Sequence, residues 1–237
     1  MCGRFTLTAD PEVVARRFGA PPVPGGGSRP RYNIAPTQSV ITVTDDGTRR
    51  LETMRWGLIP HWAKDPRIGS RLINARAETL AERPAFREAL RHRRCLIPAD
   101  GYYEWTASPE GKGRQPVRIL LQTGEPFAFA GLWDEWQPPE GGPPVRTCTI
   151  ITTAPNELVA KLHDRMPAML TPEAEALWLD PSITEPERLL PLLAPYPAER
   201  MAWYPVSTAV NQPANDVEQL VLPLSVEAQS VQTLGEK

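Results

Sequence analysis

The second residue of the chain is a cysteine, and its position gives it distinctive chemistry. Aminopeptidases remove an initiator methionine when the next side chain is as small as that of Cys2, so the processed chain is expected to begin with this residue. It then carries a free α-amine with a pKa of about 7.7–8.0 beside a thiol with a pKa of about 8.5. Such an aminothiol can attack an acyl carbon, or condense with an aldehyde to an imine and then a thiazolidine. The alternative is a small buried hydrophobic residue.

Three other side chains are suited to proton transfer or hydrogen bonding. Glu104 lies in a segment crowded with aromatic residues, and an apolar setting raises the pKa of a carboxyl group toward neutrality. His163 follows a short predicted helix and suits a general acid or base. Asn74 alternates with Arg76 on an extended segment, so its amide can point inward. Taken singly, each fits a structural role equally well: a solvent-facing strand residue for Glu104, a hydrogen-bonded histidine for His163.

Metal and cofactor chemistry is not indicated. The three cysteines lie far apart without a Cys-x-x-Cys pair, and no histidine has a partner at ligand spacing; these residues are Cys2, Cys95, Cys148, His61, His92 and His163. The sequence also has no phosphate-binding loop and no Ser-His-Asp order. We therefore expect no metal and no cofactor. Isolated cysteines without a disulfide framework favour a cytoplasmic protein.

The net charge of −2 conceals an uneven distribution. Residues 1–118 contain 20 Lys and Arg against 12 Asp and Glu, whereas residues 119–237 contain 6 against 16. Arginine accounts for 22 of the 26 basic residues and is the side chain suited to bidentate phosphate contacts. The first half can therefore form an anion-binding face, or the two halves can pair their charges within one fold. No apolar run is long enough to predict a membrane span, and no secretory signal is visible.

The chain pattern predicts short strands interspersed with isolated helices. Asp10, Pro11 and Gly19 delimit a helix, because a side-chain cap, a first-turn proline and a final glycine are typical helix boundaries. Further helices are expected over 84–92, 155–162, 172–179 and 185–193, and strands over 3–8, 39–44, 48–58, 95–105, 117–122, 126–133, 146–153 and 203–206. Without a βαβ rhythm, this pattern indicates an α+β single domain over 1–223, with a mostly antiparallel sheet or barrel core, short flanking helices, and a loose tail over 224–237.

Eight segments of the sequence occur in an order that resembles one known family. They are CGRF (2–5), YNIAP (32–36), RWGLIPHW (55–62), INARAET (73–79), CLIPADGYYEW (95–105), FAGLW (129–133), IITTAPN (150–156) and HDRMP (163–167). This series resembles the SOS response-associated peptidase (SRAP) family of abasic-site processing proteins. The likeness runs from Cys2 to about residue 216, where Val210-Asn211 resembles the closing motif of the family.

The resemblance implies a function. Family members bind single-stranded DNA in the DNA damage response, and their N-terminal cysteine links covalently to the ring-opened aldehyde of an abasic site. Carried over by motif, Cys2 is the nucleophile, and Asn74, Glu104 and His163 complete the active site. The resemblance also implies a DNA surface in which arginines bind phosphates and other side chains lie against bases; its residues are Arg4, Pro36, Trp62, Arg76, Trp105 and Arg165. We further expect a monomer, with lesion-containing single-stranded DNA as its partner.

Three other functions start from the same residues. N-terminal-nucleophile amidohydrolases also open with Met-Cys-Gly, but they carry Arg-Gly-Pro-Asp and Asn-Gly-Glu segments that this sequence does not contain. A peptidase, as in the family name, can use the Cys2 thiol against a peptide carbonyl, and self-processing would then release only Met1. A third alternative is a module that recognises damaged DNA without forming a covalent bond.

Overall fold

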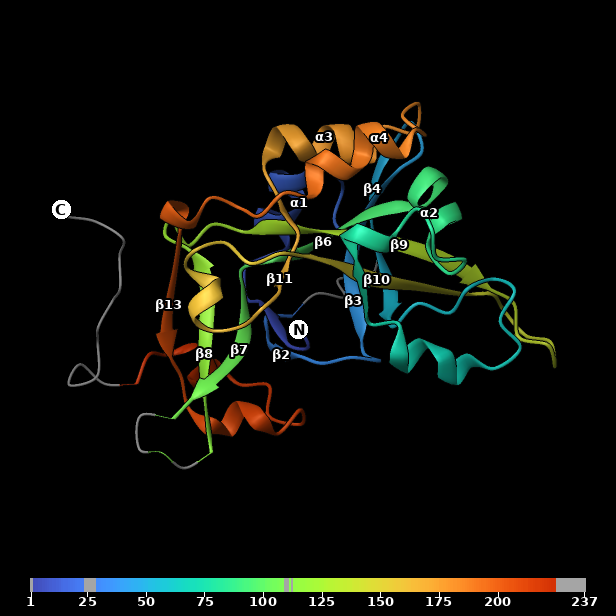
Figure 1. Cartoon of the computed structure of the whole chain (residues 1–237). Helices are drawn as coiled ribbons and strands as arrows, with labels where there is room; N and C mark the ends of the chain where they lie inside the picture. The colour runs from blue at the N-terminus through green and yellow to red at the C-terminus, as the bar shows by residue number, and fades with distance from the viewer. Residues whose placement is uncertain (1, 24–28, 109–110, 112, 225–237) are drawn as a thin grey trace.

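Strands make up most of the computed structural model, which describes residues 2–23, 29–108, 111 and 113–224. They form two sheets (Figure 1). One is antiparallel throughout, in the order β13-β8-β7-β1-β2. Its strands are β1 (Phe5–Leu7), β2 (Arg31–Ile34), β7 (Gly101–Ala107), β8 (Arg114–Leu121) and β13 (Met201–Pro205).

The other sheet closes into a barrel. β10 pairs with both β4 and β9, so the order β10-β4-β3-β6-β9 returns to its start. Only the pairings of β10 with β4 and β5 are parallel among the described strands, which confirms the predicted, mostly antiparallel barrel core. The strands are β3 (Ser39–Asp45), β4 (Arg49–Trp56), β5 (Asn74–Arg76), β6 (Arg94–Ala99), β9 (Phe127–Trp136), β10 (Val145–Thr153), β11 (Met166–Pro167) and β12 (Met169–Leu170).

The helices are short and lie outside the sheets. The α-helices are α1 (Pro11–Phe18), α2 (Arg87–His92), α3 (Pro172–Leu179) and α4 (Pro186–Leu189); the 3-10 helices are η1 (Pro66–Arg71), η2 (Ala77–Thr79), η3 (Val159–Lys161), η4 (Leu190–Leu193), η5 (Ala198–Arg200), η6 (Thr208–Asn211) and η7 (Glu218–Val221). In Figure 1, α1, α3 and α4 gather at one end of the molecule. Within the described chain, no helix combines the length and apolar character that a membrane span requires.

Some helix predictions hold and others need correction. α1 begins and ends as predicted, because the Asp10 side chain accepts the Glu12 N–H and Gly19 closes the helix at a φ of 61°. The helix predicted over 155–162 contains only the 3-10 turn η3, which begins where the Asn156 side chain accepts the Val159 N–H. The helix predicted over 185–193 is α4 followed by η4, because Pro191 lacks the N–H that an α-helix needs at that position.

Strand boundaries also differ from prediction. The predicted strand over 95–105 is two strands, β6 in the barrel and β7 in the antiparallel sheet, with a bend at Asp100. Residues 31–34, expected only to lead into a strand, form β2. Most of the predicted tail, residues 225–237, lies outside the described residues, as do residues 24–28.

Asp100 fixes β1 against the bend between β6 and β7. Its buried carboxylate accepts hydrogen bonds from the Thr6 hydroxyl at 2.6 Å, the Ala9 N–H at 2.9 Å and both the N–H and the hydroxyl of Thr8. Arg118 on β8 completes the group with an ion pair to Asp100 at 3.1 Å, and it is itself buried. A buried charge pair is stable only when its remaining donors and acceptors are satisfied, and here they converge on β1. The strand that follows Cys2 is therefore held at the end away from this residue.

Replacing Asp100 with asparagine is expected to lower the free energy of unfolding by about 3–5 kcal/mol, because it leaves the Arg118 guanidinium buried without its counter-charge. Urea denaturation monitored by circular dichroism measures the change through the midpoint at constant slope. Asp46→Asn is the matched control, since the Asp46–Arg50 pair is exposed at both side chains and is expected to contribute about 0–1 kcal/mol. Equal midpoints for the two variants would contradict an anchoring role for Asp100.

Candidate active site

Cys2 lies at the junction between the two sheets. It precedes β1, which runs between β2 and β7, and its side chain is fully buried in the main core cluster. Asn74 reaches it from the barrel, where the side-chain Nδ2 donates a hydrogen bond to the Cys2 carbonyl at 2.9 Å. Asn74 is the first residue of β5 and is held there by pairing with Ile150 on β10. Figure 1 shows the N-terminal end of the described chain in the middle of the molecule.

Glu104 reaches Cys2 from the antiparallel sheet. β1 and β7 run antiparallel with Phe5 opposite Tyr102, and the Tyr103 N–H donates to the Arg4 carbonyl at 2.9 Å. Continuing this register toward the N-terminus places Gly3, the residue after Cys2, opposite Glu104. The charge of Glu104 raises the pKa of the Cys2 thiol, so the two side chains lie within electrostatic range. The Glu104 side chain is 3 % exposed, and burial raises its pKa above the ordinary value. The sequence-based expectation of a carboxyl group in an apolar setting therefore matches the placement of Glu104.

His163 faces the same carboxyl group. It follows η3, where its own N–H donates to the Val159 carbonyl at 2.8 Å. The positive charge of His163 opposes the upward shift of the Glu104 pKa that burial causes, so the two side chains lie within electrostatic range. In the neutral ring, Nδ1 accepts the Arg165 N–H at 3.0 Å. In the imidazolium form, Nδ1–H faces the Asp164 carboxylate at 2.7 Å.

The Cys2 thiol is protonated at neutral pH in this environment. Burial raises its pKa far above the ordinary value, and the negative charge of Glu104 raises it further. A protonated thiol needs a neighbouring base before it can act as a nucleophile, and Glu104 is positioned to be that base. Burial on its own fits a small hydrophobic residue. Asn74 and Glu104 lie at Cys2, and His163 lies within electrostatic range of Glu104, an arrangement that favours a chemical role.

Arg4 and Trp105 are held together by contacts within the protein. Arg4 Nη1 donates to the Asn33 side chain and to the Val210 carbonyl, both at 2.8 Å, and the guanidinium carbon lies 5.9 Å from the centre of the Trp105 ring. Trp105 Nε1 donates to Asn211 at 2.7 Å. Both side chains are half-buried. Arg4 and Trp105 follow Cys2 and Glu104 closely in sequence, and the closing motif around Val210-Asn211 holds both of them.

Arg76 and Arg165 differ in how exposed their side chains are to solvent. Arg76 ends β5, two residues after Asn74, and is exposed. Arg165 is 15 % exposed and donates to both Glu78 carboxylate oxygens, at 2.6 and 2.9 Å, and to the Thr152 carbonyl at 2.7 Å. The pairing with Arg165 lowers the pKa of Glu78. An anion approaching Arg165 therefore meets a guanidinium already engaged by a carboxylate. Sequence reasoning missed Glu78, because no local pattern indicates a partner 87 residues away.

Trp62 lies on a loop that hydrogen bonds fix on both sides of the residue. Its side chain is 51 % exposed, and it is the only aromatic residue among the exposed large hydrophobic side chains of the described chain. The loop is held on either side, where the His61 N–H donates to Asp134 at 2.9 Å and Trp136 Nε1 donates to the Ala63 carbonyl at 2.6 Å. At its base, Gly57 has a φ of +125° and lies so close to the Gly69 carbonyl that no side chain fits there. The loop between β4 and β5 thus holds one exposed indole on a backbone that is fixed at several points.

Pro36 lies at the turn between β2 and β3. It is half-buried, and the residue after it, Thr37, adopts a positive φ of 70° and donates its N–H to the Trp56 carbonyl at 2.8 Å. This arrangement fixes the proline ring on a rigid turn. The contacts described here do not bring Pro36 or Trp62 against the four residues around Cys2, so their place in a common surface stays a prediction.

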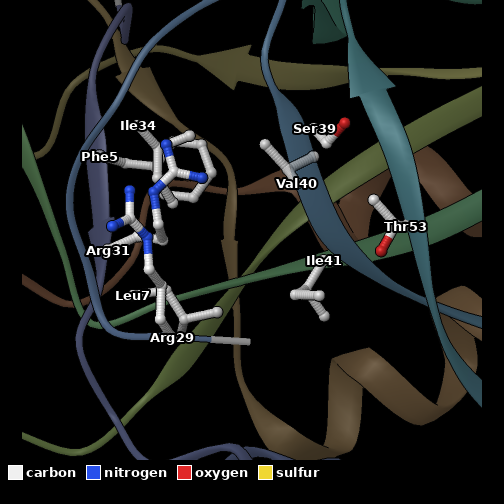
Figure 2. A pocket seen from close by; sticks show the side chains of 9 residues that line it. All are labelled: Phe5, Leu7, Arg29, Arg31, Ile34, Ser39, Val40, Ile41 and Thr53. Atoms are coloured by element: carbon white, nitrogen blue, oxygen red, sulfur yellow. The ribbon is translucent and has the colours of Figure 1, made fainter. Parts of the chain in front are cut away.

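A pocket of about 240 Å³ lies beside β1 and contains none of the four candidate catalytic residues (Figure 2). Arg29 and Arg31 extend along one side of it and Phe5 lies near their guanidinium groups. Arg31 is already engaged by Asp216 at 2.5 Å and Gln38 at 2.6 Å. The described residues also contain no group of three or more His, Cys, Asp or Glu side chains that could hold a metal ion.

The chain matches the family model described as "SOS response associated peptidase (SRAP)" over residues 1–213. It is 50% identical over 223 residues to the abasic site processing protein YoqW of Bacillus subtilis (strain 168), covering 93% of this chain and 99% of the relative. It is 32% identical over 234 residues to the abasic site processing protein YedK of Escherichia coli (strain K12), covering 94% and 100%.

A solved structure has the same fold. A protein from Bacteroides thetaiotaomicron superposes with a TM-score of 0.85 at 28% identity, covering 94% of this chain and all of that one. The family match spans both sheets and the four residues around Cys2. The chain therefore belongs to the SOS response associated peptidase (SRAP) family.

Proposed function

We propose that this protein processes abasic sites, and that it does so by binding single-stranded DNA and linking Cys2 covalently to the lesion as a thiazolidine. The observation that carries the proposal is the position of Cys2, buried between Asn74 on one sheet and Glu104 on the other. The proposal is supported by relatives that are named abasic site processing proteins and that align along nearly the whole chain.

The proposed reaction needs no oxidant and no cofactor. After removal of Met1, the α-amine lone pair of Cys2 attacks the aldehyde carbon of the ring-opened sugar, and loss of water leaves an imine. The sulfur then bonds to the imine carbon, while the thiol proton leaves through Glu104 and a proton is returned to the nitrogen. The sum is one aldehyde plus one aminothiol giving one thiazolidine and one water.

Each neighbouring side chain has a proposed part in these steps. Glu104 takes a proton from the α-ammonium and returns one to the departing hydroxyl, a task suited to a carboxyl group whose pKa is raised by burial. His163 assists opening of the sugar ring. Asn74 holds the reacting end of the chain: its Nδ2 already binds the Cys2 carbonyl, and its buried Oδ1 has no hydrogen-bond partner within the described residues. That oxygen can accept a hydrogen bond from the α-amine.

The proposed DNA surface combines cations with flat side chains. Arg76 is the exposed cation nearest in sequence to Asn74, while Arg4 and Arg165 are oriented by their contacts with Asn33 and Glu78. Trp62 supplies an exposed ring for base stacking, a contribution of about 1–3 kcal/mol per base. Pro36 and Trp105 are proposed to lie against neighbouring bases or sugars, and Gly3 lacks a Cβ that would obstruct the sugar.

A denaturing gel tests the proposal directly. The processed protein is incubated with a single-stranded oligonucleotide carrying one abasic site, boiled in detergent and separated. A shifted band is expected with the abasic oligonucleotide, and none with the intact one. A protein that retains residues ahead of Cys2 is the control; its amine is blocked, so it is expected to bind DNA without cross-linking.

The outcomes separate the alternative functions. No shifted band from protein shown by mass spectrometry to begin at Cys2 would overturn covalent processing. Selective retention of abasic DNA without a covalent band would favour a non-covalent damage-binding module. Turnover of glutamine or a peptide by the Cys2 thiol, in the absence of any cross-link, would favour the amidohydrolase or peptidase.

A further inference from the structure

Tyr102 is a fully buried tyrosine whose hydroxyl has no hydrogen-bond partner within the described residues. Its ring packs edge-on against Phe129, with 6.0 Å between ring centres, and it belongs to the main core cluster. Phenylalanine would make the same ring contacts without burying a polar group. A hydroxyl left unpaired in a core is destabilising, so its presence calls for a partner that arrives during function.

The hydroxyl belongs to the Cys2 site. Tyr102 and Glu104 are two residues apart on β7, so they point to the same face of the strand. Tyr102 also lies opposite Phe5 in the pairing of β7 with β1, the strand that follows Cys2. Burial raises the pKa of Tyr102 well above its ordinary value, and negative charge on Cys2 or Glu104 raises it further. The phenol therefore lies within electrostatic range of both groups and stays protonated.

A neutral phenol that cannot ionise is a hydrogen-bond donor for an anion formed nearby. Two anions are available at this site, the Glu104 carboxylate and the sulfur of Cys2 once its proton has left. Glu104 is already influenced by His163. The Cys2 sulfur accepts a hydrogen bond from the Arg4 backbone N–H, but no positively charged side chain is among the groups that shift its pKa within the described chain, and Glu104 disfavours its ionisation. The thiolate is thus the anion that gains most from a second donor.

We propose that Tyr102 donates its hydroxyl to the Cys2 sulfur during ring closure and so promotes the second step of the reaction. This inference rests on the function proposed above. In that step the thiol proton passes to Glu104, the sulfur bonds to the imine carbon, and the nitrogen gains a proton. Tyr102 keeps its own proton throughout and stabilises the sulfur only while it carries negative charge.

Tyr102→Phe is the test, because it removes only the hydroxyl. Imine formation, trapped with borohydride, is expected to proceed at the rate of the unmodified protein, since the amine and Glu104 are unchanged. Formation of the detergent-stable link is expected to slow by about 10- to 100-fold, the effect of losing one hydrogen bond to a charged group. The imine then accumulates, and strand cleavage at the abasic site increases because an unclosed imine can undergo elimination.

Tyr103→Phe is the matched control. Tyr103 is the next residue on β7 and points to the opposite face, where its hydroxyl donates to the Tyr32 carbonyl at 2.9 Å. Its replacement is expected to lower the melting temperature. The ratio between the rate of imine formation and the rate of ring closure is expected to stay unchanged. Tyr102→Phe is expected to melt at or above the temperature of the unmodified protein.

The outcomes are distinguishable. If Tyr102→Phe closes the ring at the unmodified rate, the proposal is wrong. Equal slowing of trapped imine and stable link would show a structural effect and would also overturn it. If the unmodified protein itself forms no link, the failure lies in the proposed function, because the comparison between variants then has no starting signal.

Discussion

Replacing Cys2 with alanine is expected to abolish the detergent-stable link to an abasic site without abolishing reaction at the N-terminus. Alanine keeps the α-amine but has no sulfur to close the ring, so the reaction stops at a reversible imine. The hydrogen bond from Asn74 goes to the backbone carbonyl of residue 2 and does not depend on the side chain. The amine is therefore expected to stay in position.

The stable link and the imine can be measured separately. A denaturing gel without reductant reports the stable link, and a parallel reaction quenched with borohydride reports the imine. Cys148→Ala serves as control, because Cys148 is an equally buried cysteine on β10 that faces no proposed chemistry. A stable link that persists in Cys2→Ala at the unmodified level would contradict the thiazolidine. Loss of both products, with retained DNA binding, would mean that the thiol is needed before the imine forms.

Replacing Glu104 with glutamine is expected to slow cross-linking by about 10²- to 10⁴-fold, the usual contribution of a positioned acid or base. Glutamine has the same shape but can neither accept the proton of the α-ammonium nor return one to the leaving hydroxyl. The rate of the unmodified protein is expected to rise with pH through the raised pKa of Glu104, because the base form is required. That rise is expected to be absent in Glu104→Gln.

The same substitution is expected to stabilise the protein at neutral pH. Since burial raises the pKa of Glu104, the folded state holds its proton more tightly than the unfolded chain does. Stability contributed in this way is present below the ordinary pKa and is lost as pH rises through the raised one. The Glu104→Gln protein has no such loss of stability. Its melting temperature is therefore expected to exceed that of the unmodified protein at pH 7 and to match it in acid.

Glu175→Gln is the control for both measurements. Glu175 is also buried, but Arg17 on α1 holds it through two hydrogen bonds, at 2.8 and 2.9 Å. Burial raises the pKa of Glu175 as well, so this variant is expected to change stability in the same direction as Glu104→Gln while keeping the unmodified cross-linking rate. A Glu104→Gln protein that reacts at the unmodified rate would remove Glu104 from the mechanism.

A structural feature can be predicted from the sequence when the residues that determine it lie close together in the chain. The boundaries of α1 are local, because Asp10, Pro11 and Gly19 each act on the backbone within a few residues. The break between β6 and β7 is not local. It depends on hydrogen bonds that the Asp100 carboxylate accepts from Thr6 and Thr8, more than 90 residues away. A continuous apolar run therefore predicted one strand where the chain passes from the barrel to the other sheet.

The same contrast between local and long-range determinants applies to the candidate site. Motif resemblance selected Cys2, Asn74, Glu104 and His163, which the fold gathers from separate elements. Alternation along 102–105 could have placed Tyr102 on the face of Glu104, but depth within the core cannot be read from one strand. The pairing of Arg165 with Glu78 was also hidden, because η2 and the segment after η3 meet only in the folded molecule.

The complete burial of Cys2 affects how long its thiol stays unoxidised when peroxide is present. Peroxide attacks thiolates, and the first product, a sulfenic acid, can proceed to forms that no longer react. A thiol that is both enclosed and kept protonated by its surroundings offers peroxide little to attack. DNA lesions and oxidants arise under the same conditions. In the proposed function, shielding of this kind keeps the Cys2 nucleophile intact until an abasic site reaches it.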